Sequence, residues 1–153
     1  MFTHPSVDDQ LVHDVLARRH YMESSVHGLQ HWQRVERNGL SLAEIEGGDS
    51  LVISLFALFH DSQRIDDFED IEHGKRGALL AVEFYNNGRL NISEDQFHLL
   101  TEACRNHTES LFSDNTTIRC CWDADRLDLT RIYVIPDPDM LNTNTAKKFA
   151  RTL

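Results

Sequence analysis

The dipeptide His60-Asp61 is the first feature that suggests chemistry, because it directly follows the apolar run LVISLFALF at 51–59. Arg64 comes three residues after the aspartate. A run this apolar is predicted to lie in the core, where a carboxylate without a cationic partner is costly. We therefore expect groups from other parts of the chain to meet His60 and Asp61.

Two further stretches carry side chains that could lie next to His60 and Asp61. His27 and His31 are four residues apart, so a helix would project both from one face. The segment CWDADRLDL at 121–129 sets three carboxylates among apolar neighbours in a predicted helix, namely Asp123, Asp125 and Asp128. Imidazole nitrogens and carboxylate oxygens together suit a borderline divalent metal ion such as Mn, Fe, Co, Ni or Zn.

The elements that must position these groups are predicted to be helices. Apolar residues recur with helical spacing along most of the chain, and helix ends are marked by Gly47-Gly48, Asn86-Asn87-Gly88 and a Ser93/Gln96 capping-box pattern. The predicted helices cover 6–21, 27–45, 51–60, 73–85, 93–107 and 116–132, with a short last helix from about 142. The acidic segment 62–72 lacks periodicity and is predicted to be a loop. The expected fold class is all-α.

The length and composition indicate one ordinary globular domain. At 153 residues the chain is expected to form a single domain, 1–153, built as a bundle of six or seven helices. Residues 136–153 are expected to form a C-terminal tail or short helix, because Pro136 and Pro138 interrupt the helix before them.

The charge and the cysteines limit the surroundings in which the protein is expected to work. A net charge of −10 argues against broad binding to polymeric nucleic acid or to an anionic membrane. The three cysteines form no CxxC pair, and the N-terminus lacks a signal-peptide pattern. We therefore expect a cytoplasmic protein, and we leave its oligomeric state open.

The order of the motifs resembles the HD-domain superfamily of metal-dependent phosphohydrolases. HWQRV at 31–35, HD at 60–61 and DADRL at 123–127 follow that family's pattern H…HD…D, over about residues 27–130. The resemblance implies an all-helical fold in which four side chains from separate helices meet around a divalent metal ion, one of Mn, Mg, Co, Ni, Fe or Zn. The implied metal ligands are His31, His60, Asp61 and Asp125.

The motifs also assign roles to the neighbours of these ligands. Asp125 is preferred to Asp123 because Asp125 matches the aspartate of the family's ADRL motif. Asp123 is expected at the helix surface or behind the ligands. Because His31 rather than His27 begins the HxxRV motif, His27 is expected to support the ligands from behind or to contact the substrate.

Arg64 departs from the family pattern, since the best-known HD subgroups carry a lysine at this position, in HDIGK. An arginine can bind phosphate through two hydrogen bonds but cannot give up a proton. We expect Arg64 to bind the substrate phosphate. A surface ion pair with Asp67 or Asp70 is the alternative.

His73 and His107 lie in the interval where HD subgroups with two metals place two additional histidines. His73 comes thirteen positions after His60, which is short for such a subgroup and favours one metal ion. His107 and His73 are then expected to face the substrate. The alternatives are a second-metal role for both histidines and a surface position for His73.

The resemblance implies hydrolysis of a phosphate ester or anhydride, with a metal-bound water as nucleophile. Asp61 would help to accept the proton of that water, Arg64 and His107 would steady the phosphate, and His107 would protonate the leaving oxygen. Because the loop 66–72 is acidic, the expected substrate is a nucleotide or another small phosphorylated metabolite. The alternatives are a non-catalytic module that binds a metal or a nucleotide, and an oxygenase with two irons.

Overall fold

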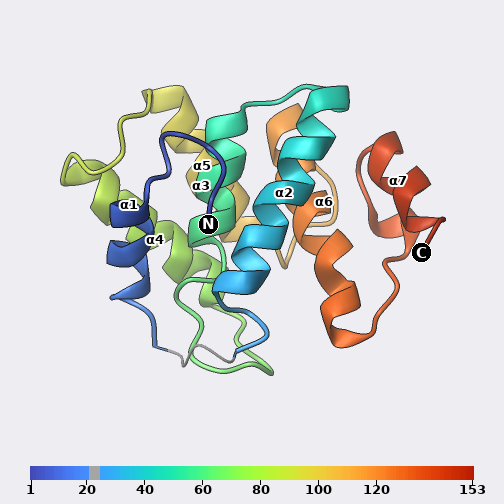
Figure 1. Ribbon diagram of the computed structural model, residues 1–153, viewed down its shortest axis with the longest axis horizontal. Coiled ribbons are helices and arrows are strands. Elements are labelled where there is room, and N and C mark those ends of the chain that lie inside the picture. Colours follow the sequence, from blue (N-terminus) through green and yellow to red (C-terminus); the bar gives the residue numbers. More distant parts are fainter. Residues whose placement is uncertain (21–24) are drawn as a thin grey trace.

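The computed structural model describes residues 1–20 and 25–153, and the regular structure of these residues is helical throughout (Figure 1). It comprises α1 (Asp9–Leu16), α2 (Leu29–Glu46), α3 (Ser50–Phe59), α4 (His73–Asn86), α5 (Glu94–Asn106), α6 (Thr116–Leu127), α7 (Asn144–Ala150) and two 3-10 helices, η1 (Asp128–Ile132) and η2 (Pro138–Met140). No strand occurs in these two ranges. The predicted all-α fold is confirmed.

Helix α3 is the centre of the arrangement. Every residue from Val52 to Phe59 is buried, and α3 packs against α1, α2, α4, α5 and α6. In Figure 1, α1 and α4 lie on one side of α3, whereas α6 and α7 lie on the other. Burial of a Leu, Ile or Phe side chain contributes about 1.5–3 kcal/mol each. The apolar run therefore carries its C-terminal end into the middle of the protein.

Short-range signals set several helix ends as predicted. The Asp49 side chain caps α3 by accepting from the backbone N–H groups of Leu51 and Val52. Ser93 and Gln96 form the reciprocal capping box that opens α5. Helix α2 ends before Gly47, whose φ of 86° lies in the left-handed region that favours glycine.

Three predicted helices differ from the observed ones. Helix α1 begins later than predicted, because Asp8 caps it by accepting from the N–H of Leu11, and it ends already at Leu16. The predicted end at Tyr21 itself lies outside the described residues. Helix α2 begins after Gly28, so His27 and His31 do not share a helix face as predicted. The helix predicted over 116–132 is α-helical to Leu127 and then tightens into η1.

Asp123 attaches the C-terminal segment to the core. The side chain is fully buried; Oδ1 accepts from the backbone N–H and the side-chain amide of Asn142 at 2.7 and 3.2 Å, and Oδ2 accepts from the N–H and hydroxyl of Thr143 at 2.7 and 2.8 Å. Thr143 in turn caps α7. The predicted surface position is wrong, because Asp123 is buried, and these four hydrogen bonds join it to Asn142 and Thr143 rather than to a metal ligand.

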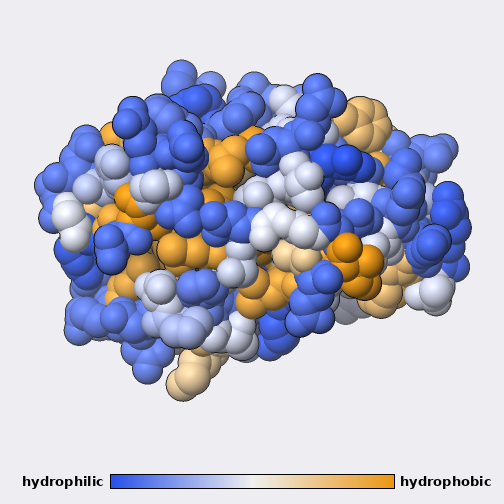
Figure 2. Space-filling view, turned by 90° about the horizontal axis from the view of Figure 1, so that it is seen from above, coloured by the Kyte–Doolittle hydropathy of each residue, from blue (hydrophilic) through white to orange (hydrophobic). Residues whose placement is uncertain are grey.

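The outer surface is mainly polar at the end remote from the loop 62–72. Figure 2 shows this end, with charged and polar side chains over much of it and apolar side chains at the surface in separate patches. None of the helices in the described part of the chain combines the length and the apolar character needed to cross a membrane.

Asp123→Ala is expected to lower the free energy of unfolding by about 3 kcal/mol, because it leaves the buried donors of Asn142 and Thr143 without acceptors. Urea denaturation followed by circular dichroism measures the change. Asp139→Ala, which removes an exposed carboxylate from the same segment, is the matched control. Equal stability of the Asp123 variant and the wild type would show that the hydrogen bonds of Asp123 to Asn142 and Thr143 do not stabilise the fold.

Candidate metal centre

The predicted ligands converge on one point. His31 lies in the first turn of α2, His60 and Asp61 follow α3, and Asp125 lies in α6. His31 Nε2 is 3.2 Å from Asp61 Oδ2, 3.2 Å from Asp125 Oδ1 and 3.1 Å from His60 Nε2. One ligand atom from each of the four residues lies within 4.8 Å of the others, so this group can hold a metal ion.

A second group shares Asp61 with the first. Asp61 Oδ1 is 3.1 Å from His73 Nε2 and 3.5 Å from His107 Nε2, and the two imidazole nitrogens are 3.0 Å apart. These three residues also meet the distance requirement for a metal site. His73 is buried, so the alternative of a surface position is wrong. The short spacing between His60 and His73 did not prevent the second group from forming.

Two glycines bring α4 close enough to place His73 there. A Cβ on Gly77 would lie 2.5 Å from the carbonyl oxygen of Phe59, and a Cβ on Gly74 would lie 2.6 Å from that of Cys104. Side chains do not tolerate such distances, so the close contact of α4 with α3 and α5 requires glycine at both positions.

The four histidines have the same orientation. In each ring Nδ1 lies against an oxygen that only accepts hydrogen bonds, so Nδ1 carries a proton and Nε2 faces the centre. The acceptors are Asp128 Oδ2 for His31 (2.7 Å), the carbonyls of Phe56 and Ala57 for His60 (3.1 and 3.0 Å), the carbonyl of Asp70 for His73 (2.5 Å) and that of Cys104 for His107 (2.7 Å). This orientation is common for metal-binding histidines, whose other nitrogen donates to a carbonyl or carboxylate.

The resulting donor set fits a cation. In neutral rings the Nε2 atoms bear lone pairs, so nitrogens about 3 Å apart repel each other unless a positive charge lies between them. Metal–nitrogen bonds of about 2.0–2.1 Å at a right angle separate two nitrogens by about 3 Å. The geometry therefore suits nitrogen and oxygen ligands of one divalent ion in each group.

The pKa values of the first group also indicate a site that suits a cation. Burial alone would lower the pKa of His31, but hydrogen bonds to Asp125, Asp128 and Asp61 outweigh it and raise the pKa to about 10. Burial would raise the pKa values of Asp61 and Asp125, yet the adjacent histidines hold both well below the usual range. Without a metal, the centre therefore relieves its excess negative charge by keeping a proton on His31.

Asp128 orients His31, a role that the sequence patterns did not identify. Its Oδ2 accepts from His31 Nδ1, and its Oδ1 accepts from Arg34 Nε at 2.8 Å. Arg131 donates to the backbone oxygen of Asp128, also at 2.8 Å. The available signal was that Arg34 belongs to HWQRV and that Asp128 lies three residues after Asp125.

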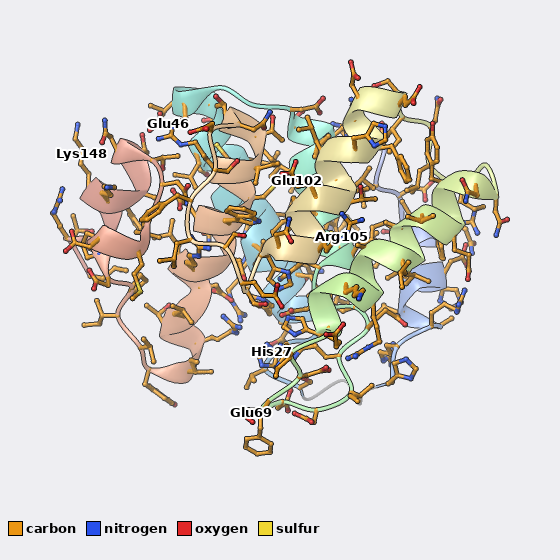
Figure 3. All side chains as sticks on the ribbon, turned by 180° about the vertical axis from the view of Figure 1, so that it is seen from behind. His27, Glu46, Glu69, Glu102, Arg105 and Lys148 are labelled. Atoms are coloured by element: carbon orange, nitrogen blue, oxygen red, sulfur yellow. The ribbon has the colours of Figure 1, made fainter. Side chains whose placement is uncertain are left out.

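His27 lies beside Asp61 although it precedes α2. Its Nδ1 is 3.2 Å from Asp61 Oδ2 and 3.3 Å from Arg131 NH2. In Figure 3, His27 is at the same end of the molecule as Glu69, which belongs to the acidic loop. The side chain therefore reaches the centre from the loop before α2 rather than from a shared helix face.

Arg64 is buried beside the second group. Its Nε donates to the backbone oxygen of Asp66 at 3.2 Å, and its NH1 lies 3.1 Å from His73 Nε2 and 3.9 Å from Asp61 Oδ1. Helix α3 ends at Phe59, so this position is set by the turn that follows rather than by a continued helix.

The alternative of a surface ion pair for Arg64 is wrong. Asp67 accepts a hydrogen bond from the hydroxyl of Ser25 at 2.6 Å, and Asp70 pairs with Arg76 at 2.5 Å. The carboxylate next to Arg64 is that of Asp61.

A pocket of about 270 Å³ borders the centre. Asp61, His27 and Arg64 form part of its wall, and Trp32 is among its apolar residues. A polar pocket of about 410 Å³ lies on the side of His31 that faces Asp128. His107 lines neither pocket.

Comparison with known proteins bears on the fold. No protein-family model matches the chain, and no curated protein sequence matches it. A crystal structure of a predicted HD superfamily hydrolase from an uncultured Thermotogales bacterium matches 94% of this chain and 83% of that chain, with a TM-score of 0.73 and 23% identity. The fold is the HD-domain fold. The resemblance predicted from H…HD…D is thus confirmed at the level of the fold.

Metal binding is expected to release protons and to strengthen as pH rises. The metal-free protein keeps a proton on His31 at neutral pH, because the pKa of about 10 lies above the ordinary 6.5. A bound ion must displace this proton, so the apparent affinity should increase with pH until His31 is deprotonated. Calorimetric titration in two buffers of different ionisation enthalpy measures the release. His98→Ala, which removes an exposed histidine, is the control and should release the same number of protons as the wild type. Equal heats of metal binding to the wild type in both buffers would contradict the prediction.

Asp128→Ala is expected to weaken metal binding about 10–100-fold, because His31 loses the carboxylate that orients its ring. Competition with a chelator of known affinity measures the change. Glu44→Ala removes an exposed carboxylate from α2 and should leave the affinity unchanged. Wild-type affinity in the Asp128 variant would show that Asp128 does not orient a ligand.

Proposed function

We propose that this protein is a metal-dependent phosphohydrolase that acts on a small phosphate ester or nucleotide. The observation that carries the proposal is one cluster beside a pocket. In it, the Nε2 atoms of His31 and His60 lie next to the ionised carboxylates of Asp61 and Asp125. The solved protein of the same fold is described as a predicted hydrolase, which supports a hydrolase at that general level.

The proposed metal ligands are His31, His60, Asp61 and Asp125. Two imidazoles and two carboxylates suit Mn, Fe, Co, Ni or Zn better than Mg, which prefers oxygen ligands and water. His73 and His107 offer a second position that shares Asp61. A divalent ion held by these groups supplies a Lewis acid for a phosphoryl oxygen and lowers the pKa of a water that it binds.

Side chains of the pocket wall are proposed to accept a proton and to bind the phosphate. Asp61 lies in the pocket wall, where an ionised carboxylate can accept a proton from the attacking water. His27 contacts Asp61 at 3.2 Å and lines the same pocket, so it can bind a phosphate oxygen next to the centre. Arg64 adds a permanent positive charge to this wall.

His107 does not suit the predicted roles of phosphate contact and proton donor. Its Nδ1–H is taken by the carbonyl of Cys104, and its Nε2 faces His73 and Asp61. A neutral His107 therefore has no proton to give to a leaving oxygen. We propose that His107 belongs instead to the second group, with His73 and Asp61.

The pocket favours a small substrate. Its volume of about 270 Å³ is slightly below the usual range for small-molecule sites, and Leu16, Leu29 and Trp32 are apolar residues of its lining. The acidic loop 66–72 lies close by, because Asp67 contacts Ser25 of the pocket wall. A small phosphorylated molecule with an apolar part fits these walls better than polymeric nucleic acid.

A di-iron oxygenase is the second candidate, favoured by one observation. The oxygenase requires both additional histidines, and His73 and His107 do meet at Asp61. Iron analysis together with oxygen uptake on candidate substrates tests this activity. Phosphate release without oxygen uptake would exclude it.

The test of the proposed function is metal analysis of the purified protein, followed by a phosphate-release screen over mononucleotides and sugar phosphates. Asp61→Ala should abolish metal retention and lower phosphate release by more than the roughly 10–100-fold that loss of an outer partner costs. Glu69→Ala, which removes an exposed carboxylate from the adjacent loop, should retain both.

Two outcomes would count against this function. A wild-type protein that binds metal but releases no phosphate from any member of the screen would favour a non-catalytic binding module. Equal activity of the Asp61 and Glu69 variants would show that the centre does not catalyse the reaction.

A further inference from the structure

The second group, formed by Asp61, His73 and His107, has the guanidinium of Arg64 beside it. His73 Nε2 lies 3.1 Å from Asp61 Oδ1, 3.0 Å from His107 Nε2 and 3.1 Å from Arg64 NH1. Nδ1 of His73 and of His107 each donates to a backbone carbonyl, so both Nε2 atoms are acceptors when the rings are neutral. Of these three neighbours, only Arg64 brings hydrogen-bond donors and a positive charge.

The first group differs in this respect. Within residues 1–20 and 25–153, the polar neighbours of His31 Nε2 and His60 Nε2 are each other and the carboxylates of Asp61 and Asp125. Among the described residues, no guanidinium lies within hydrogen-bond distance of these two nitrogens. In the described part of the chain the two groups therefore differ in one respect: a guanidinium, whose charge is permanent, lies beside the second group and not beside the first.

Arg64 is held in place by its surroundings. The side chain is buried, its Nε donates to the backbone oxygen of Asp66 at 3.2 Å, and its NH2 lies 3.5 Å from the backbone oxygen of Phe68. These contacts leave NH1 directed at His73, with Asp61 Oδ1 at 3.9 Å as the nearest carboxylate oxygen. The guanidinium is thus fixed by the loop after α3.

We propose that Arg64 serves as the resident cation of the second group and holds the protein to one metal ion. The inference rests on the proposed metal centre. A metal ion bound by His73 Nε2 would have to share the space beside this nitrogen with Arg64 NH1, which lies against the ring, 3.1 Å from both Nε2 and Nδ1. It would also lie close to a permanent positive charge in a buried site, where like charges repel strongly.

The test is the number of Co²⁺ ions bound per protein, measured by equilibrium dialysis and elemental analysis at a series of free Co²⁺ concentrations. The wild type should bind one ion. Arg64→Met should bind two, with at least a roughly tenfold gain in affinity for the second. Arg64→Lys, which keeps a positive charge, should remain at one.

Two further variants locate the additional ion. Adding His73→Ala to Arg64→Met should return the count to one, because the second group then lacks a nitrogen ligand. Arg131→Met removes another guanidinium near the centre, one that is partly buried and contacts His27 rather than His73, and this variant should also remain at one ion.

His73→Ala in the wild-type background covers the case in which the Arg64 variants fail to fold. With Arg64 intact, this variant should keep its single ion, and loss of that ion would overturn the inference. Two ions in the wild type, or one in a folded Arg64→Met protein, would overturn the inference and leave the proposed function standing. No ion in any of the proteins would overturn both.

Discussion

The structure depends on one buried carboxylate. Asp61 is ionised at the end of the most apolar helix of the protein, where water cannot stabilise its charge. Each of its oxygens therefore requires positive or donor groups from other elements. Oδ2 is surrounded by His27, His31 and His60, and Oδ1 by His73, His107 and Arg64. Neutralising this single side chain requires contributions from α2, α4, α5 and the loop that follows α3.

Helix ends help to meet this requirement. His60 and His107 occupy the C-cap positions of α3 and α5, and each ring donates to carbonyls in the last turn of its own helix. Carbonyls at the C-terminal end of a helix are open to such additional donors, and that of Phe56 accepts from the backbone N–H of His60 as well as from its ring. The same bonds turn Nε2 towards Asp61. Two of the four histidines are thus oriented by the ends of the helices that carry them.

The two carboxylate oxygens of Asp61 face groups with different properties. On one side, acceptors from α2, α3 and α6 leave a space that suits a divalent ion. On the other, Arg64 supplies a charge that belongs to the chain itself. A protein that carries its own cation beside a shared carboxylate needs fewer metal ions to neutralise that carboxylate. The arginine that departs from the HDIGK pattern is therefore consistent with the proposed single metal ion.

The sequence by itself determined the helical fold and four of the converging residues, because both follow from local signals. Periodicity reports which helix face is buried, caps report where a helix starts, and the motifs of His31, His60, Asp61 and Asp125 can be read from consecutive residues. Only the tertiary structure decided the rest, since it depends on which distant groups share one space. His73 meets His107 because glycines let α4 approach α5, and Asp123 turns to the C-terminal segment while Asp128 turns to His31.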